Sequence, residues 1–127
     1  MHSYFCGAGI YEMKPSINLI VLRCKDIRIS RKFYEKLGFK FTLEKHGSGP
    51  EHYASESKGL VLELFPAEKK VKDTIRLGFS FKNLEKLKLT EAEIINIFNR
   101  DGMKCLLIMD PDGRRIECTQ REQYELN

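Results

Sequence analysis

The sequence predicts an α+β domain built from two tandem β-α-β-β-β modules, and two spacings in the chain support this prediction. A glutamate follows a turn glycine by four residues from Gly59 to Glu63 and again from Gly113 to Glu117. Upstream of each pair, an apolar segment runs into a residue suited to capping a helix, Asp26 in the first copy and Asn83 in the second. Repeats of this length usually mean that neither copy buries its apolar face alone. We therefore expect the two copies to pair about an approximate twofold axis.

The first module opens with a nearly continuous apolar strand over residues 17–23, in which alternate side chains share one face: Leu19, Val21 and Arg23. Asp26 then caps a helix that ends at Gly38 and carries apolar residues at intervals of four: Ile29, Phe33 and Leu37. Three strands are expected after the helix, over residues 39–44, 52–55 and 60–65. Glycine-containing turns separate the last three strands.

The second module follows a lysine-rich linker at residues 68–73 and begins with a strand over 74–81. Its last two strands, 103–109 and 115–119, flank the turn Asp110-Pro111-Asp112-Gly113. Between them and the first strand, Thr90 and Glu93 resemble a capping box that would start a helix through Phe98. The alternative ends a short helix near Thr90 and makes residues 94–98 a strand. We favour the strand because it preserves the spacing of the repeat.

Composition indicates one domain in a chain of 127 residues, with 42% hydrophobic and 31% charged residues. No apolar run approaches the length of about 18 residues that predicts a membrane span. The first residues lack the pattern of a secretion signal, so the cytoplasm is the expected location. The domain is expected at 16–127, with modules at about 16–67 and 73–121, and residues 1–15 are expected to be an N-terminal extension, for which a disordered arm is one interpretation. A net charge of +4 without a recognised binding motif argues against nucleic acid as a partner.

The cysteines of the chain show no spacing typical of a zinc site or a redox pair. They are Cys6, Cys24, Cys105 and Cys118, and three of them fall in predicted strands or directly after one. Reduced, buried thiols are the expectation.

The tandem modules, the helix segment Phe33-Tyr34-Glu35-Lys36-Leu37-Gly38 and the closing Asp-Pro-Asp-Gly-x-x-Ile-Glu from Asp110 to Glu117 together resemble the vicinal-oxygen-chelate superfamily. This superfamily includes glyoxalase I, bleomycin-resistance proteins and extradiol dioxygenases, and the resemblance covers about residues 16–120. It implies a cup-shaped mixed sheet around a divalent metal, with metal ligands on the first and last strands of each module. It also implies a homodimer with a small-molecule ligand.

Carried over by this resemblance, the four metal-ligand positions fall at Leu19, Glu63, Arg76 and Glu117. Both glutamates match the glyoxalase pattern as catalytic and metal-binding residues. Leucine cannot ligate a metal, and a guanidinium stays protonated and repels a cation. We therefore interpret the superfamily's metal site as degraded, with no cofactor expected. If the two carboxylates do retain a divalent metal, nickel, zinc, manganese or iron are the candidates.

Three further residues are expected to line the ligand site, together with Leu19 and Arg76: Val21, Arg23 and His52. We hypothesise that Arg76 replaces the metal's charge and bridges Glu63 and Glu117; the alternative is three solvated strand residues without mutual contact. Arg23 matches a strand-one arginine that approaches the substrate carboxylate in glyoxalase I, and an exposed strand charge is its alternative. His46 and His52 flank the glycine turn, where they reach either a ligand or only solvent.

Three functions follow in order of preference. The first is a small-molecule binding protein of bleomycin-resistance type that holds an anionic or amphipathic ligand without metal. The second is a lyase, isomerase or dioxygenase, similar to lactoylglutathione lyase, that keeps a metal through Glu63 and Glu117, with His52 or water completing the shell. The third is a basic module that binds nucleic acid. The resemblance does not decide whether the modules pair within one chain or between two.

Overall fold

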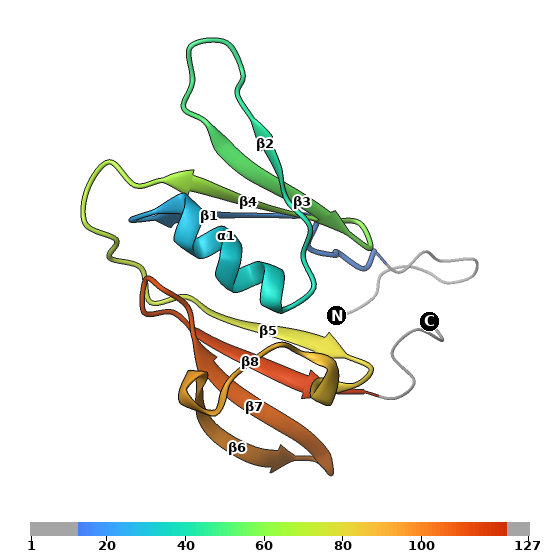
Figure 1. The fold of residues 1–127 in the computed structure, drawn as a ribbon. Helices are drawn as coiled ribbons and strands as arrows, with labels where there is room; N and C mark the ends of the chain where they lie inside the picture. The colour runs from blue at the N-terminus through green and yellow to red at the C-terminus, as the bar shows by residue number, and fades with distance from the viewer. Residues whose placement is uncertain (1–12, 122–127) are drawn as a thin grey trace, which may run out of the picture.

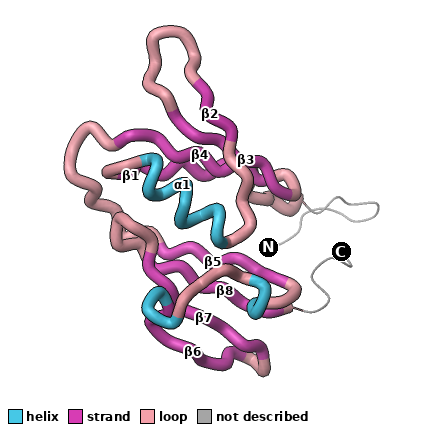
Figure 2. Tube along the Cα trace, in the orientation of Figure 1, coloured by secondary structure: helices cyan, strands magenta, loops and turns pink. Residues whose placement is uncertain are grey.

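The computed structural model describes residues 13–121, which form two four-stranded mixed sheets with one α-helix between them (Figures 1 and 2). Sheet A has the strand order β1 (Leu19–Cys24), β4 (Leu60–Pro66), β3 (His52–Ser57) and β2 (Thr42–Glu44). Sheet B has the order β5 (Arg76–Phe81), β8 (Arg115–Gln120), β7 (Met103–Met109) and β6 (Ile94–Arg100). The pairs β1–β4 and β5–β8 are parallel, and the other neighbouring strands are antiparallel. The predicted fold class, two tandem β-α-β-β-β modules, is confirmed.

Helix α1 (Ile27–Lys36) begins where the sequence predicts. The carboxylate of Asp26 accepts hydrogen bonds from the backbone N–H groups of Arg28 and Ile29. The helix is followed by Gly38, whose φ of +100° lies in the left-handed region that glycine adopts without strain.

The prediction of which helix face is buried was wrong at one position. Ile29 is 54% exposed, and the buried positions are instead Ser30, Phe33, Tyr34 and Leu37. Two hydrogen bonds to the second module explain why the helix turns Ser30 and Tyr34, rather than Ile29, towards the interior. The hydroxyl of Tyr34 donates to the buried Asp110 carboxylate at 2.7 Å, and Ser30 donates to Asp112 at 3.4 Å.

One core serves both modules. It joins residues of sheet A, of α1 and of sheet B into one buried cluster that includes Leu22, Leu62, Leu64, Phe33, Tyr34, Leu37, Ile108, Ile116 and Cys118. Strand β2 is shorter than predicted because Phe39 and Phe41 pack partly buried against this core, where Phe39 meets Phe79 of sheet B edge to face. Each sheet therefore turns one face towards α1.

The turn from Asp110 to Gly113 fastens the second module to the first. The side chain of Arg114 is 1% exposed, and its guanidinium donates hydrogen bonds to Asp73, to Asp110 and to the backbone carbonyl of Arg23. Asp112 accepts a hydrogen bond from the backbone N–H of Lys25 at 2.9 Å. Buried charges persist in proteins only when paired in this way.

The segment between β5 and β6 resolves the ambiguity in the sequence. Residues 94–98 belong to β6, as we favoured, and the expected short helix is reduced to two 3₁₀ turns, Leu84–Lys86 and Glu91–Glu93. Thr90 and Glu93 do form a capping box, but it opens only the second of these turns. The alternating Lys-Leu-Lys-Leu sequence at 86–89 lacks the period of an amphipathic helix, which explains the absence of a longer one.

The described cysteines agree with the expectation. Cys24, Cys105 and Cys118 are free and buried, and burial raises the pKa of the Cys24 thiol to about 11 and that of Cys118 to about 12. Cys6 and nearly all of the predicted extension at 1–15 lie outside the described residues. Within residues 13–121, no helix has the length and apolar character needed to span a membrane.

Candidate functional site

Every residue predicted for the ligand site lies on a sheet face turned away from α1. We call this the outer face of each sheet. On sheet A, strand alternation and register place the predicted residues together on the outer face: Leu19, Val21, Arg23, His52 and Glu63. On sheet B, Arg76 and Glu117 lie on the outer face, opposite to the buried Ile116 and Cys118. Because α1 fills the space between the inner faces, the two outer faces point away from each other.

On the outer face of sheet A, ring stacking links β1, β4 and β3. The Arg23 guanidinium lies 5.1 Å from the centre of the Phe65 ring, a cation–π contact. The same ring stacks on His52 at 4.1 Å between centroids and 9° between planes. The ring of His46 lies 5.3 Å from that of His52. His52 is consequently only 1% exposed although it lies on an outer face.

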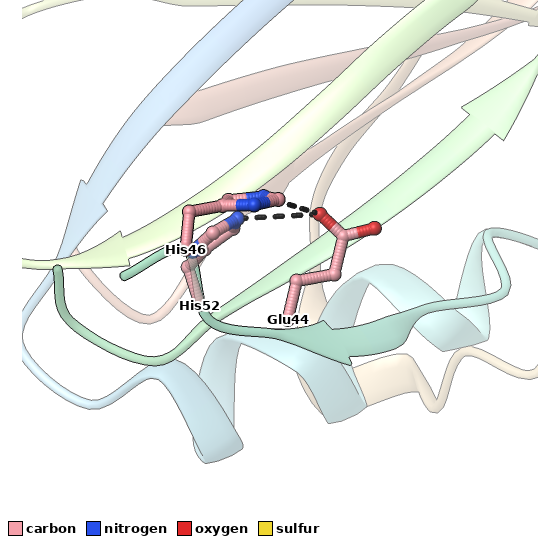
Figure 3. A group of neighbouring side chains, drawn as sticks. All are labelled: Glu44, His46 and His52. Carbon is pink, nitrogen blue, oxygen red and sulfur yellow. Dashed lines mark hydrogen bonds and ion pairs between the residues drawn. The ribbon is translucent and has the colours of Figure 1, made fainter. Parts of the chain in front are cut away.

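The imidazole of His52 also approaches two carboxylates. Its Nε2 atom is 3.4 Å from Oε1 of Glu44 and 3.9 Å from Oε2 of Glu63. The Nε2 atom of His46 is 3.4 Å from the same oxygen of Glu44, so both rings converge on one carboxylate (Figure 3). This geometry arises from the β2–β3 hairpin, because Glu44 is the register partner of His52 and His46 follows Glu44 by two residues.

On the outer face of sheet B, both oxygens of the Glu117 carboxylate are bound by arginines. Arg76 lies 2.5 Å from Oε2, and Arg100 donates a hydrogen bond to Oε1 at 2.7 Å. Glu117 borders a pocket of about 310 Å³ whose lining includes Gly78, Ser80 and Arg100. The small side chains of β5 leave this pocket open above the sheet.

The hypothesis that Arg76 bridges two glutamates is met by the structure on one side. The ion pair between Arg76 and Glu117 is present, whereas the carboxylate of Glu63, on the other sheet, lies 3.9 Å from Nε2 of His52. Among the described residues, no hydrogen bond or ion pair joins Arg76 to Glu63. The two glutamates thus belong to separate surfaces of one chain.

Two residues of these clusters were missed by the sequence reasoning. Arg100 ends β6 beside a turn, and nothing local marks it as a partner of Glu117 across β7. Glu44 could have been found, because a Glu-x-His pattern before a glycine turn with a histidine at the start of the next strand places all three side chains at one end of a hairpin.

The pKa of the Glu117 carboxyl is lowered. Burial opposes its ionisation, but the hydrogen bonds from Arg100 and Arg76 outweigh this effect. The hydrogen bond from Arg114 likewise lowers the pKa of Asp73. Since the folded chain holds these protons less tightly than the unfolded chain, their stabilising effect is fully present above the ordinary values of 4.5 and 3.8 and is lost as the pH falls through the lower folded values.

We therefore expect the free energy of unfolding to fall as the pH is lowered from about 6 to about 3. In Glu117→Gln and Asp73→Asn this fall should be smaller than in the wild type. Glu51→Gln, which removes an exposed carboxylate, should retain the wild-type slope. Urea denaturation at a series of pH values measures all four proteins, and equal slopes would contradict the roles given to Glu117 and Asp73.

In both sheets, the strand that comes first in the sequence pairs in parallel with the one that comes last. This arrangement agrees with a match to a protein-family model. The model of the glyoxalase/bleomycin resistance protein/dioxygenase superfamily matches residues 16–118. The chain belongs to this superfamily. No curated protein matches the chain by sequence.

Solved structures with a fold similar to that of this chain include an enzyme and a binding protein. Lactoylglutathione lyase from Agrobacterium tumefaciens is 14% identical, with a TM-score of 0.64 over 89% of this chain and 98% of that chain. TnmS3, an antibiotic binding protein from Streptomyces sp. CB03234, is 18% identical, with a TM-score of 0.65 over 87% and 98%. An integron cassette protein from V. cholerae is 23% identical, with a TM-score of 0.62 over 87% and 98%. At these identities the likeness concerns the fold.

The residues at the superfamily's metal-ligand positions do not fit a metal. Leu19 offers no donor atom, Arg76 brings a positive charge, and both oxygens of Glu117 are occupied by guanidinium groups. The carboxylate of Glu63 approaches His52, and within residues 13–121 no arginine forms an ion pair with it.

Proposed function

We propose that this chain is a small-molecule binding protein of bleomycin-resistance type, which holds a small anionic or amphipathic ligand without a metal at the superfamily's position. The observation that carries the proposal is the pair of guanidinium groups on Glu117 at the rim of the 310 Å³ pocket. The pocket is lined by two arginines, Arg100 and Arg121, and by two carboxylates, Asp101 and Glu117. Arg76 adds a third guanidinium at Glu117, so one positive charge is left over for an anion.

The chemistry of both outer faces suits such a ligand. Arg121 also lines the pocket on sheet B. Arg23 also borders a second pocket of about 440 Å³, whose other lining residues belong to the segment after β4 and include Lys69, Lys70 and Lys72. Next to Arg23 on β1, Leu19 and Val21 are 52% and 40% exposed and supply apolar surface. A ligand with an anionic group and an apolar body would use both kinds of contact.

We further propose that the complete cup forms between two copies of the chain. Glu63 and Glu117 lie on outer faces that one chain turns apart, whereas a second copy can place its sheet B beside sheet A of the first. Within residues 13–121, each sheet has two edge strands with an unpaired side, β1 and β2 in sheet A and β5 and β6 in sheet B. Of these we propose β1 and β5 as the edges that meet. An apolar unpaired edge such as β1 invites a partner strand. The expected assembly is a homodimer.

Binding should depend on the two arginines that contact Glu117. In a thermal-shift screen of anionic metabolites and amphipathic antibiotics, at least one compound should raise the melting temperature of the wild type. Arg76→Ala and Arg100→Ala should each weaken its binding by at least about tenfold, because each removes a charge-assisted hydrogen bond and exposes the charge of Glu117. Isothermal titration measures the affinities.

Arg28→Ala is the matched control, since Arg28 is an exposed arginine on α1, away from both outer faces, and its removal should leave the affinity unchanged. A screen without any shift would count against a binding function. Equal weakening in all three variants would show only a general effect of charge.

The alternative function is a metal-dependent lyase, isomerase or dioxygenase, similar to lactoylglutathione lyase. The approach of His52 to Glu63 favours it, because a histidine and a carboxylate are common metal ligands. Glu117 would have to leave both arginines to join them.

A cytoplasmic location and the absence of nucleic-acid binding remain predictions.

A further inference from the structure

We propose that the β2–β3 hairpin carries a binding site for a divalent transition metal, formed by Glu44, His46 and His52. None of these three residues is among the superfamily's metal-ligand positions, which the resemblance placed at Leu19, Glu63, Arg76 and Glu117. It does not depend on the proposed small-molecule function. Zinc is the ion whose coordination the three side chains match most closely.

The spacing of the ligand atoms agrees with tetrahedral coordination. One ligand atom from each of Glu44, His46 and His52 lies within 4.8 Å of the other two. Each histidine Nε2 is 3.4 Å from Oε1 of Glu44. Two ligands at the zinc bond length of about 2.05 Å in a tetrahedron are about 3.3 Å apart. A metal ion could therefore contact the carboxylate and both imidazoles with small movements of the side chains, which converge in Figure 3.

The second observation is an unpartnered nitrogen in a buried ring. The side chain of His52 is 2% exposed, and its Nε2 atom is buried without a hydrogen-bond partner. Its Nδ1 atom lies 3.3 Å from the backbone carbonyl of Pro50. A carbonyl oxygen can only accept, so Nδ1 carries the proton, and in the neutral ring Nε2 presents a lone pair. A buried polar atom without a partner costs free energy, which a metal ion at Nε2 would recover.

The same contact explains the orientation of the ring. Histidines that bind metals usually donate their other N–H group to a carbonyl or carboxylate, which fixes the tautomer. Pro50 plays this part for His52. The stacked ring of Phe65 on one side holds the imidazole plane in place. His52 is thus preorganised as a ligand before any ion arrives.

The charge at the hairpin also favours a cation. The lone pair of Nε2 points towards the carboxylates of Glu44 and Glu63, and the three groups have no donor between them unless a proton or a cation is present. Glu63 is 3.9 Å from His52 and supplies a candidate fourth ligand or a partner for a bound water. Two histidines with one or two carboxylates form a typical set for zinc, and for other first-row divalent ions.

His46 provides the entry side. Its side chain is 76% exposed, in contrast to the buried His52. It lies in a turn in which the N–H of Gly49 bonds the carbonyl of His46, and Gly47 has a φ of +58°. A metal ion could reach the site from solvent and join the exposed and the buried histidine across the hairpin.

The test is titration of the full chain, purified without a polyhistidine tag and stripped of metal, with Zn²⁺ by calorimetry and with Co²⁺ by visible absorption. We expect one ion per chain and the strong absorption of tetrahedral Co²⁺. His46→Ala and Glu44→Gln should each weaken binding by on the order of 100-fold, since even indirect partners of metal ligands are worth 10- to 100-fold. Both replaced side chains are at least partly exposed, so the variants should fold.

Two control variants separate this site from adventitious binding. His2→Ala removes the remaining histidine of the three in the chain, and Glu51→Gln removes an exposed carboxylate beside the hairpin turn; both should bind as the wild type does. A protein that binds no stoichiometric ion, or whose affinity survives His46→Ala and Glu44→Gln, would overturn the proposal. The latter two variants leave Arg76 and Arg100 intact, so a failure here would not affect the small-molecule proposal.

Discussion

Replacing Arg114 with alanine should lower the free energy of unfolding by about 3–5 kcal/mol, the usual cost of breaking a buried ion pair by removal of one partner. The guanidinium is 1% exposed and contacts Asp110, whose side chain is 0% exposed. Without Arg114, the carboxylate of Asp110 stays buried with the neutral hydroxyl of Tyr34 as its remaining side-chain partner. Urea denaturation, followed by circular dichroism, measures the loss.

Because Arg114 lies where the two modules meet, its replacement should also weaken the contact between them. Its guanidinium bonds the carbonyl of Arg23 at the end of β1 and the carboxylate of Asp73 in the linker. Arg114 therefore connects three parts of the chain that are far apart in sequence. With a smaller group at this position, the hydrogen bonds of Asp112 and Tyr34 are the polar contacts that still join the last hairpin to the first module.

The neighbouring Arg115→Ala is the control, because this arginine is exposed and its loss should change stability by no more than about 0.5 kcal/mol. Arg114→Lys keeps the charge but cannot reproduce the forked contact with Asp73, so an intermediate loss is expected. If Arg114→Ala unfolds the chain entirely, Arg114→Lys still measures the effect. Equal stability of Arg114→Lys and Arg115→Ala would contradict the role of this network.

Much of the fold could be predicted from the sequence because both modules use the same kinds of turn and capping residues. The turn before Ile116 and Glu117, the cap at Asp26 and the stop at Gly38 each act within a few residues, and all three are present. Such local rules can be read without knowing the partner surface.

The face that α1 buries could not be read in this way. Ile29 is the better hydrophobic residue, but Tyr34 is buried because its hydroxyl meets Asp110, which lies 76 positions later in the chain. Likewise, Arg100 finds Glu117 only through the register of β6, β7 and β8. These contacts depend on tertiary structure, which periodicity does not encode.

The arrangement of the modules was the third unknown, for a different reason. Pairing within one chain and pairing between two chains bury the same apolar stripe of each module, so the alternation of Leu19, Val21 and Arg23 fits both. In the single chain, one buried cluster joins α1 to residues of both sheets, and this leaves the outer faces free. From this burial follows a prediction for the assembled site.

Metal binding at the superfamily's position should be restored by complementation between two different variants. One chain carries Leu19→His, which adds a donor beside Glu63, and the other carries Arg76→His, which adds a donor and removes a cation beside Glu117. If the cup forms between chains, refolding a mixture of the two creates one site with two histidines and two glutamates in each mixed dimer. The gain in affinity over either variant alone should be on the order of 100-fold, by the scale of losses at known metal sites.

The experiment is made in a His46→Ala background, so that the hairpin site does not contribute to the signal. Arg100→Ala is added to both chains, because Arg100 would otherwise still occupy Glu117. Binding of Ni²⁺ or Zn²⁺ is followed by calorimetry, and each variant alone supplies the control. A chain carrying both Leu19→His and Arg76→His should form two such sites per dimer. If this double variant binds metal while the mixture of single variants does not, the modules pair within one chain, and the two-copy cup is wrong. If the mixture binds, the outward faces of the two sheets, which one chain holds apart, are the two halves of one site.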